Sequence, residues 1–230
     1  MSESLFLVVF IFFCYLVGST PTSIIVGRII RGIDIREHGS GNAGGTNVFR
    51  VLGWKPGLFV IVVDMLKGWI PVSILAPEFF KLQIVSDLGV LQILSGFSAV
   101  IGHTYTIFAR FKGGKGVGTL GGMMIALFPT VFPFCLAIAA LTIVMTGYVS
   151  LASIIASCSL PILLLIIPPL MNVSPAPLSI MIFSLLVPWF IIYTHRSNVQ
   201  RIRNGNENKF KKAMIFNLSL IHISEPTRPY

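Results

Sequence analysis

The sequence predicts an all-α integral membrane protein, built as a single bundle of transmembrane helices. Composition is the first reason: 54% of the 230 residues are hydrophobic and 11% are charged, whereas a soluble domain carries about 25% charged residues. The mean hydropathy of +0.86 agrees with this class. The third reason is that the apolar residues fall in runs close to the length of about 20 residues that a helix needs to cross a bilayer.

These apolar runs predict seven transmembrane helices. The N-terminal run lacks the basic start of a secretory signal, so it is expected to be the first helix and not a cleaved leader. Residues 117 to 168 allow two long crossings or three shorter ones, and Pro129, Pro133 and the polar TGYVS (Thr146–Ser150) favour three. The predicted segments are Ser4–Val26, Gly57–Ala76, Leu88–Phe108, Val117–Val131, Pro133–Val149, Ser150–Pro168 and Leu178–Thr194.

Basic residues gather in alternate loops, which predicts the orientation in the membrane. Because positively charged loops stay in the cytoplasm, the N-terminus is expected outside and the C-terminus inside. Seven crossings satisfy the pattern, five would satisfy it as the fallback, and six would not. The net charge of +9 is therefore attributed to topology and anionic head groups, not to nucleic acid. The basic residues of the predicted cytoplasmic loops and tail are Arg28, Arg31, Arg36, Arg50, Lys55, Arg110, Lys112, Lys115, Arg196, Arg201, Arg203, Lys209, Lys211 and Lys212.

The chain is expected to form one membrane-embedded domain over residues 1–209, followed by a basic cytoplasmic tail over 210–217. The last stretch, LSLIHISEPTRPY (Leu218–Tyr230), resembles the translation of a sequencing adapter and is predicted to be non-native. The three cysteines lie in separate apolar runs, so neither a disulfide framework nor a metal site is predicted from them.

The first glycine-rich loop, HGSGNAGG, is predicted to bind a phosphate group. Glycine lets backbone N–H groups approach a ligand closely, and successive N–H groups form an anion-binding nest. Ser40 and Asn42 add side-chain donors, and Arg50 adds a bidentate fork. A plain turn remains the alternative. The expected substrate-binding residues of this loop are Gly39, Gly41, Asn42, Thr46 and Asn47.

The second glycine-rich loop, GGKGVGT, is predicted to bind a second phosphate. Gly113, Gly114 and Gly116 would supply N–H groups and Lys115 a positive charge. The loop opens into a predicted helix whose N-terminus also favours an anion. Helix packing or a simple turn is the alternative, because small residues also serve close helix contacts in membranes.

Two charged residues, Asp64 and Lys67, lie inside the second predicted helix. Charges within a membrane span are costly and usually paired, and residues three apart on a helix are neighbours. A structural ion pair is therefore favoured over a role in the site. His195, flanked by Arg196 and Asn198, is a candidate site residue at the start of the C-terminal basic run.

Several catalytic patterns are absent from the sequence. It has no HxxxxD arrangement, no HExxH, no GxSxG and no paired acidic cluster for magnesium. A metal-dependent phosphoryl transferase is thus poorly supported, and no metal or cofactor is expected.

Six motifs in order resemble the PlsY family, the bacterial acyl-phosphate:glycerol-3-phosphate acyltransferases. They are GSTPTS, GSGNAGGTNVFRVLG, DMLKGWIPV, GHTYTIFARFKGGKGVGT, YVSLAS and HRSNVQRI. The resemblance implies a seven-helix inner-membrane enzyme with its active site on the cytoplasmic side. Such an enzyme transfers a fatty acyl group from acyl phosphate to the primary hydroxyl of glycerol 3-phosphate, giving lysophosphatidic acid and phosphate.

Carried over by motif, the resemblance implies a set of catalytic residues. Ser150 is an alternative to Ser153 if the register slips, and Glu207 matches a family glutamate expected to be structural. Glycines at 45, 118 and 147 depart from the family pattern, and Gly147 stands where the family often has arginine. The implied catalytic residues are Ser40, Arg50, Lys115, Ser153, His195 and Asn198.

The expected partners are acyl phosphate, glycerol 3-phosphate and membrane lipids, with the enzyme that makes acyl phosphate as a further candidate and no nucleic acid. Without a serine–histidine–acid triad in the sequence motifs, direct attack of glycerol 3-phosphate is expected, with no acyl-enzyme. The competing hypothesis is a transporter for a small organic phosphate. Transporters often contain inverted repeats, and the sequence shows no second copy of GSGN or GGKG.

Overall fold

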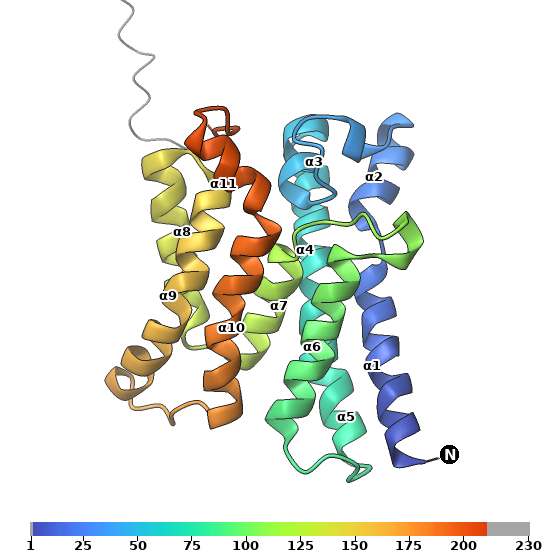
Figure 1. Cartoon of the computed structure of the whole chain (residues 1–230), viewed down its shortest axis with the longest axis vertical. Helices are drawn as coiled ribbons and strands as arrows, with labels where there is room; N and C mark the ends of the chain where they lie inside the picture. The colour runs from blue at the N-terminus through green and yellow to red at the C-terminus, as the bar shows by residue number, and fades with distance from the viewer. Residues whose placement is uncertain (1, 211–230) are drawn as a thin grey trace, which may run out of the picture.

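The computed structural model describes residues 2–210, and throughout this range the secondary structure is helical, with no strand (Figure 1). The basic tail predicted for 210–217 lies outside the described residues apart from Phe210, as does the adapter-like segment Leu218–Tyr230. The predicted all-α class is confirmed for the described range.

The first predicted helix is broken near its middle. It consists of α1 (Glu3–Ser19) and α2 (Thr22–Arg31), separated by Thr20 and Pro21. Pro21 has no backbone N–H to donate, and it sits at the cap of α2. The short helices η1 (Ile35–Glu37) and α3 (Gly45–Leu52) follow and carry the first glycine-rich loop.

The second predicted helix is longer than expected. α4 (Trp54–Ile70) continues through a π-helical turn, η2 (Pro71–Leu75), into α5 (Ala76–Phe80). Pro71 at the start of this turn removes a helical donor, and a π-turn is one way in which a helix absorbs such a loss. α6 (Leu88–Thr104) and the single turn η3 (Ile107–Ala109) make the third helix and lead to the second glycine-rich loop.

Residues 117 to 170 form three separate helices, as Pro129, Pro133 and the TGYVS stretch predicted. These are α7 (Val117–Leu127), α8 (Phe132–Thr146) and α9 (Val149–Leu170). α10 (Leu178–Thr194) has the predicted bounds, and α11 (Arg196–Arg203) follows it after a bend of 61°.

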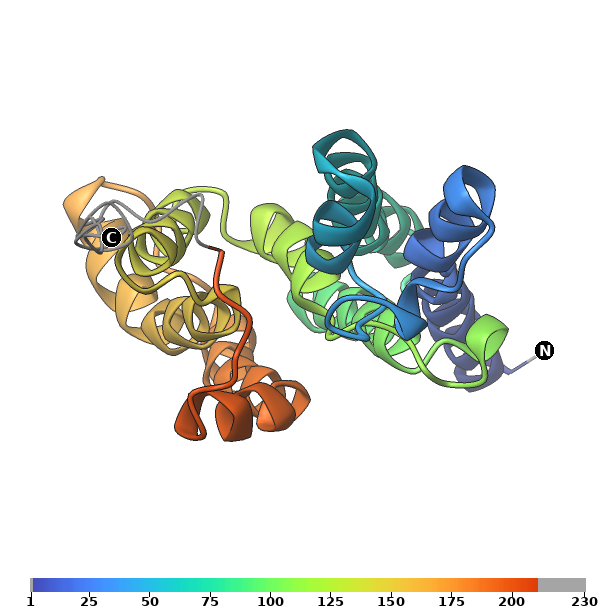
Figure 2. The same cartoon turned by 90° about the horizontal axis from the view of Figure 1, so that it is seen from above.

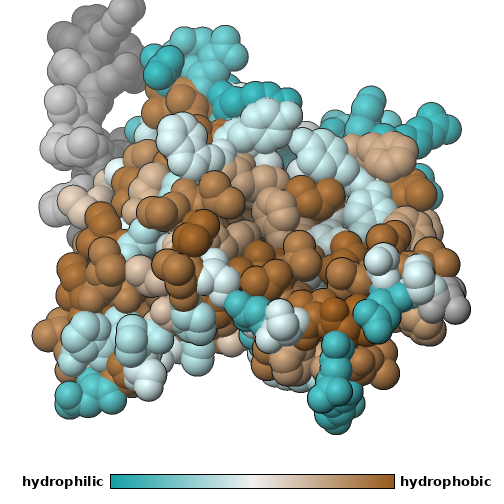
Figure 3. Space-filling model, turned by 60° about the horizontal axis from the view of Figure 1, so that its bottom comes forward, coloured by the Kyte–Doolittle hydropathy of each residue, from teal (hydrophilic) through white to brown (hydrophobic). Residues whose placement is uncertain are grey.

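Within residues 2–210, four helical stretches are long and apolar enough to cross a membrane, or five if α10 and α11 count as one bent span. They are Glu3–Arg31, Trp54–Phe80, Leu88–Ala109 and Val149–Leu170. α7 and α8 have 11 and 15 residues, fewer than the roughly 20 that a full crossing requires. Hydrophobic side chains cover much of the helical surface, and hydrophilic ones gather toward its ends (Figure 3). The protein is thus a multi-pass membrane protein, and seven crossings stay a prediction.

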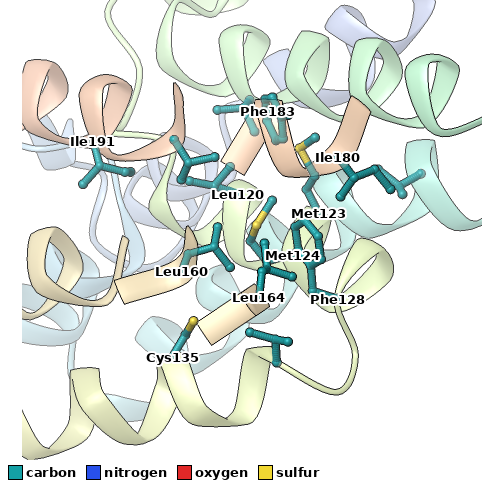
Figure 4. Close-up of a cluster of buried hydrophobic side chains, with 14 of the residues drawn as sticks. Leu120, Met123, Met124, Phe128, Cys135, Leu160, Leu164, Ile180, Phe183 and Ile191 are labelled. Atoms are coloured by element: carbon teal, nitrogen blue, oxygen red, sulfur yellow. The ribbon is translucent and has the colours of Figure 1, made fainter. Parts of the chain in front are cut away.

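Seen from above, the helices form two groups with α7 between them (Figure 2). One group contains α1 to α6, and the other contains α8 to α11. A core of buried side chains joins α7 to the second group: Leu120 and Met124 of α7 converge with Leu160 of α9 and Phe183 of α10 (Figure 4). α7 therefore connects the two groups, together with the contact of Phe97 of α6 with Phe183 and Phe190 of α10.

On its other side, α7 packs backbone to backbone against α4. A Cβ atom added to Gly68 of α4 would lie 1.8 Å from the carbonyl oxygen of Thr119, and one added to Gly122 would lie 1.8 Å from that of Met65. Only glycine permits this approach, as at other small-residue helix contacts in membranes. The position of α7 is thus set by glycines on both helices.

We expect Gly122→Ala to destabilise the protein by about 1–3 kcal/mol, because the added methyl group must push α7 away from α4. Gly121→Ala is the matched control: its Cβ would meet only Phe132, at 3.9 Å, and replacing a helical glycine by alanine stabilises by about 0.5–1 kcal/mol. Thermal unfolding of both variants in the same detergent measures the difference. Equal melting temperatures would contradict the close packing of these helices.

Candidate active site

A pocket of about 210 Å³ opens between the two groups of helices. Its walls come from the first glycine-rich loop, α4, the start of α7, the start of α9 and the junction of α10 with α11. The structure brings together here all the predicted site residues that carry a side chain, namely Ser40, Asn42, Thr46, Asn47, Arg50, Lys115, Ser153, His195 and Asn198. The five predicted glycines do not line it.

A hydrogen-bonded chain centred on Glu207 crosses the pocket. Lys115 Nζ donates to Asn198 Oδ1, and Asn198 Nδ2 donates to Glu207 Oε1 at 2.6 Å. Ser150 Oγ donates to the same carboxylate at 2.9 Å, and Arg201 Nε at 2.7 Å. Glu207, expected to be structural, thus fixes side chains from the loop before α7, from α9 and from α11.

Positive charge dominates the pocket. Lys115 and Arg50 line the pocket with Glu207, whose charge is paired with Arg201, and Asp64 is neutralised by its own partner, Lys67. Burial raises the pKa of Glu207, but hydrogen bonds from Asn198, Arg201 and Ser150 outweigh it and the pKa is lowered. The site therefore holds more positive than negative charge at neutral pH and is suited to an anion such as phosphate.

Two cations that line the pocket, Lys115 and Arg50, have lowered pKa values, because burial disfavours the charged form. Burial lowers the pKa of Lys115 to about 8, with the positive charges of Arg201 and Arg50 adding to the effect and Glu207 opposing it. Burial also lowers the pKa of Arg50, with Glu207 opposing it and Arg201 adding to it. A bound anion would restore the charge of Lys115, so binding and protonation are coupled.

His195 is buried at the corner between α10 and α11. Its Nδ1 lies 2.9 Å from the carbonyl oxygen of Ile191. A carbonyl can only accept a hydrogen bond, so Nδ1 is the protonated nitrogen and Nε2 of the neutral ring is an acceptor. The predicted histidine therefore lines the pocket with a defined tautomer.

In the first loop, Asn47 is the residue that builds the turn. Its Oδ1 accepts the N–H of Ser40 at 2.8 Å, and its Nδ2 donates to the carbonyls of Ile35 and His38 at 3.0 and 2.9 Å. Gly39 has a φ of +61°, and a Cβ atom there would lie 2.4 Å from Asn47 Oδ1. The glycine is needed so that the turn can close around Asn47 and present Ser40.

The second loop differs from the predicted phosphate nest. The N–H of Gly113 donates to the carbonyl of Thr104 at 3.0 Å, and that of Gly114 donates to His103 at 3.1 Å. These two amides are thus engaged by the end of α6, and a Cβ atom on Gly113 would lie 2.0 Å from the His103 oxygen. For Gly113 and Gly114, close packing therefore fits better than a phosphate nest; it was the alternative that the sequence left open.

Backbone N–H groups without a helical partner lie slightly further on, at the start of α7. Gly116 caps this helix with a φ of +80°, and the first helical hydrogen bond is donated by Leu120. The N–H groups of the first turn have no partner within the helix, and Val117 and Gly118 line the pocket. The predicted helix N-terminus, and not the glycine pair before it, therefore faces the site.

The two candidate serines both line the pocket but have different surroundings. Ser150 is buried and bonds to Glu207, whereas Ser153 Oγ donates to the carbonyl of Val149 at 3.0 Å. They are three residues apart on α9 and so share a helix face. The sequence predicted no site role for Arg201 or His103, and for Asp64 it left a site role only as the alternative to a structural ion pair. Arg201 lay in an ordinary basic run, and the other two lay inside apolar segments.

An apolar cavity of about 360 Å³ adjoins the polar pocket. The two share Ile61, Val117, Gly118 and Ser153, and the apolar cavity continues between α7, α8, α9 and α10. Its walls include Leu136, Ala139 and Leu160. A charged head could thus lie in the polar pocket while an attached hydrocarbon chain lies between the helices.

The fold and the two joined cavities define a class: a multi-pass membrane protein with a polar, cationic pocket that adjoins an apolar cavity, a combination suited to an amphiphile with an anionic head. The comparisons with known proteins narrow this class. The family model for glycerol-3-phosphate acyltransferase matches residues 8–205. The chain therefore belongs to the glycerol-3-phosphate acyltransferase family, as the resemblance to PlsY predicted, and it is an acyltransferase.

Individual relatives and solved structures support the same family. The chain is 43% identical over 221 residues to the glycerol-3-phosphate acyltransferase of Chlorobium phaeobacteroides, covering 86% of this chain and 93% of that protein. It is 44% identical over 215 residues to that of Chlorobaculum parvum, covering 85% and 92%. Crystal structures of PlsY, an integral membrane glycerol 3-phosphate acyltransferase, superpose with TM-scores of 0.74 for the glycerol 3-phosphate form and 0.72 for the lysophosphatidic acid form. The first is 35% identical and covers 89% of this chain and 95% of that one.

The charge state of Lys115 can be measured directly. An amine reagent attacks only the neutral form, so the labelling rate of Lys115 should rise with pH around a midpoint near 8, compared with about 10.4 for an ordinary lysine. Since Glu207 raises the pKa of Lys115, Glu207→Gln should move the midpoint lower. The exposed Glu37→Gln is the control and should leave it unchanged. Mass spectrometry of the labelled peptide gives the midpoint, and an ordinary lysine value would contradict the buried site.

Proposed function

We propose that this acyltransferase uses acyl phosphate as its donor and transfers the acyl group to the primary hydroxyl of glycerol 3-phosphate. The products are lysophosphatidic acid and inorganic phosphate. The observation that carries the proposal is the junction at Ser153, Val117 and Gly118, where the cationic pocket meets the apolar cavity. An acyl phosphate has its reactive carbonyl between a phosphate and a hydrocarbon chain, so that carbonyl would lie at this junction.

The cations and the helix N-terminus have complementary roles in this proposal. Lys115 and the first turn of α7 would hold one phosphate, and Arg50 would hold the other with its planar fork. Ser40, Ser153 and Asn198 would orient substrate oxygens. The structures of PlsY in glycerol 3-phosphate and lysophosphatidic acid forms support a site of this kind, since the two names give one substrate and the product.

The chemical step is a direct attack. The glycerol hydroxyl oxygen forms a bond to the acyl carbonyl carbon, the bond from that carbon to the phosphate oxygen breaks, and phosphate leaves. The hydroxyl proton passes to a substrate phosphate oxygen, with His195 Nε2 as the alternative acceptor within the protein. Because the mixed anhydride is already activated, the residues contribute mainly positioning and charge stabilisation.

No covalent acyl-enzyme is part of the proposal. The ring nitrogen of His195 that would pair with an acid in a triad faces the carbonyl of Ile191 instead. The hydroxyl of Ser153 donates to the carbonyl of Val149, and that of Ser150 donates to Glu207. Each serine is thus engaged with an acceptor other than the histidine, which favours a role in orientation.

We further propose seven crossings, an outside N-terminus and an active site on the cytoplasmic face of the inner membrane. The N-terminus and the end of α11 lie at opposite ends of the bundle, which favours an odd number of crossings (Figure 1). The basic loops would then meet anionic lipid head groups on the cytoplasmic side. Membrane lipids and the enzyme that makes acyl phosphate are the proposed partners, and neither a cofactor nor nucleic acid is required.

Purified protein in detergent tests the proposal. Wild-type protein given acyl phosphate and glycerol 3-phosphate should release lysophosphatidic acid and phosphate in equal amounts. Absence of turnover, together with counterflow of glycerol 3-phosphate in liposomes, would support the transporter alternative. A labelled acyl group that remained attached to the protein would contradict direct attack.

Lys115→Ala should lower kcat by about 10²–10³-fold, the loss typical when one charge-stabilising donor is removed. Lys112→Ala is the matched control, because Lys112 lies in the same loop with an exposed side chain outside the pocket. Both variants should elute and melt like the wild type. Normal turnover by Lys115→Ala would overturn the proposed phosphate site.

The apolar cavity should set the acyl chain length. Ala139→Phe adds volume to the cavity wall, so donors with long chains should lose kcat/KM more than short ones, by at least about tenfold, because each buried CH₂ contributes about 0.8 kcal/mol. Ala140→Phe, on the same helix but exposed outside the cavity, is the control. A series of acyl phosphates of increasing length measures the profile. An equal effect of both variants would show that the chain binds elsewhere.

A further inference from the structure

A second polar cluster lies at the wall of the reaction pocket, between α4 and the end of α6. It consists of Asp64 and Lys67 of α4 and His103 of α6, whose residues are 3%, 5% and 8% exposed. Asp64 and His103 line the reaction pocket, and Lys67 lies behind them. The sequence predicted only that Asp64 and Lys67 would pair, and the proposed mechanism uses none of the three.

Lys67 and Asp64 connect three helices. Lys67 Nζ donates to Asp64 Oδ1 at 2.6 Å and to the carbonyl oxygen of Thr20 at 2.6 Å. Thr20 lies in GSTPTS, at the break between α1 and α2, where this carbonyl is not used by a continuous helix. His103 Nδ1 lies 3.6 Å from the same Asp64 oxygen. The cluster therefore ties α4 to the end of α1 and places His103 of α6 beside Asp64.

His103 in turn holds the loop that carries Lys115. Its carbonyl oxygen accepts the N–H of Gly114 at 3.1 Å. Its ring lies against the same residue, since a Cβ atom on Gly114 would be 2.2 Å from His103 Nε2. Gly114 immediately precedes Lys115, so the position of the ring determines where the lysine leaves the loop.

Asp64 supports the other half of the anion site. A Cβ atom on Gly118 would lie 3.1 Å from Asp64 Cβ, which places the aspartate against the first turn of α7. Val117 and Gly118 of that turn line the pocket, and the N–H groups of a first helical turn have no partner within the helix. Behind the pair, a cavity of about 10 Å³ is lined by Thr20, Thr22 and Gly114 together with Asp64 and His103. The pair therefore forms a wall at the base of the pocket.

We propose that Asp64 and His103, with Lys67 as counter-ion, are positioning residues for the phosphate site. They hold Gly114 and the first turn of α7 so that Lys115 and the helix N-terminus converge on one phosphate. This inference rests on the proposed function. A buried ion pair is weak support for stability, because an apolar replacement of similar size is often as stable, whereas a shift of about 1 Å in a positioning group costs about 10²-fold in rate.

Four variants separate positioning from folding. Asp64→Asn combined with Lys67→Met removes both charges together, so no unpaired charge is left buried. His103→Leu removes the ring, and His103→Asn keeps a donor near the position of Nδ1. Ser98→Ala is the matched control: its hydroxyl donates to the carbonyl of Ile11 at 2.9 Å, a polar contact of α6 that is remote from the pocket.

The main readout needs no turnover. Inorganic phosphate should protect Lys115 from an amine reagent, and mass spectrometry gives the phosphate concentration for half protection. We expect the double variant and His103→Leu to require at least about tenfold more phosphate, His103→Asn to recover most of the protection, and Ser98→Ala to match the wild type. Where acyl transfer is measured, KM for glycerol 3-phosphate should rise in the same order.

The inference would be overturned if the double variant and His103→Leu both fold and phosphate still protects Lys115 in them as well as it does in the wild type. If the double variant does not fold, Gly114→Ala decides. Its methyl group would lie 2.2 Å from His103 Nε2 and 2.9 Å from the carbonyl oxygen of Ala43, so it moves the loop away from His103 while both charges of the ion pair stay in place. Unchanged protection in this variant would also overturn the inference. Failure of the proposed function would give a distinct result. The wild-type protein would then transfer no acyl group, yet phosphate would still protect Lys115, and the variants would still rank in the same order of protection.

Discussion

The contact from Lys115 to Asn198 is the interaction on which the site depends, because it joins the two groups of helices across the pocket. Lys115 belongs to the loop between α6 and α7, and Asn198 to α11, which packs with α9 and α10. Glu207 extends the connection through Asn198, Ser150 and Arg201. With this carboxylate as the shared acceptor, the remaining positive charge of the pocket is directed at a ligand and not consumed by internal pairs. Since neither group contains the whole site, its geometry depends on α7 and the glycines that set α7 against α4.

The substrates of the proposed reaction need two opposite environments, one polar and one apolar, and the structure provides them in two adjoining cavities. Phosphates need charges and N–H groups, which the pocket supplies from Lys115, Arg50 and the start of α7. A fatty acyl chain needs apolar walls, which α7 to α10 supply. α7 begins where the two cavities meet, since Val117 and Gly118 in its first turn line both of them. The same helix therefore closes the core, supplies backbone donors to the anion and forms one wall of the apolar cavity.

Much of this organisation could be predicted from the sequence. The hydrophobic runs predicted where the helices lie, and Pro129 and Pro133 predicted the break between α7 and α8. The side chains taken from the motifs all reach one pocket, because charged and amide groups in such a chain have few places other than a polar cavity. The amides of Gly113 and Gly114 could not be assigned, since spacing does not reveal which carbonyl lies opposite an N–H group. Glycine spacing likewise could not show that Asn47 fills its own loop. The number of crossings also remains open, because α7 and α8 are shorter than the bilayer requires.

The most direct test of the account is a structure of the wild-type protein with a non-hydrolysable acyl phosphonate. We expect the phosphonate to bind within hydrogen-bond distance of Lys115 Nζ and the first turn of α7, and the hydrocarbon chain to extend past Ser153 toward Ala139 and Leu160. A phosphonate bound away from Lys115, or a chain lying outside the cavity between α7 and α10, would contradict it.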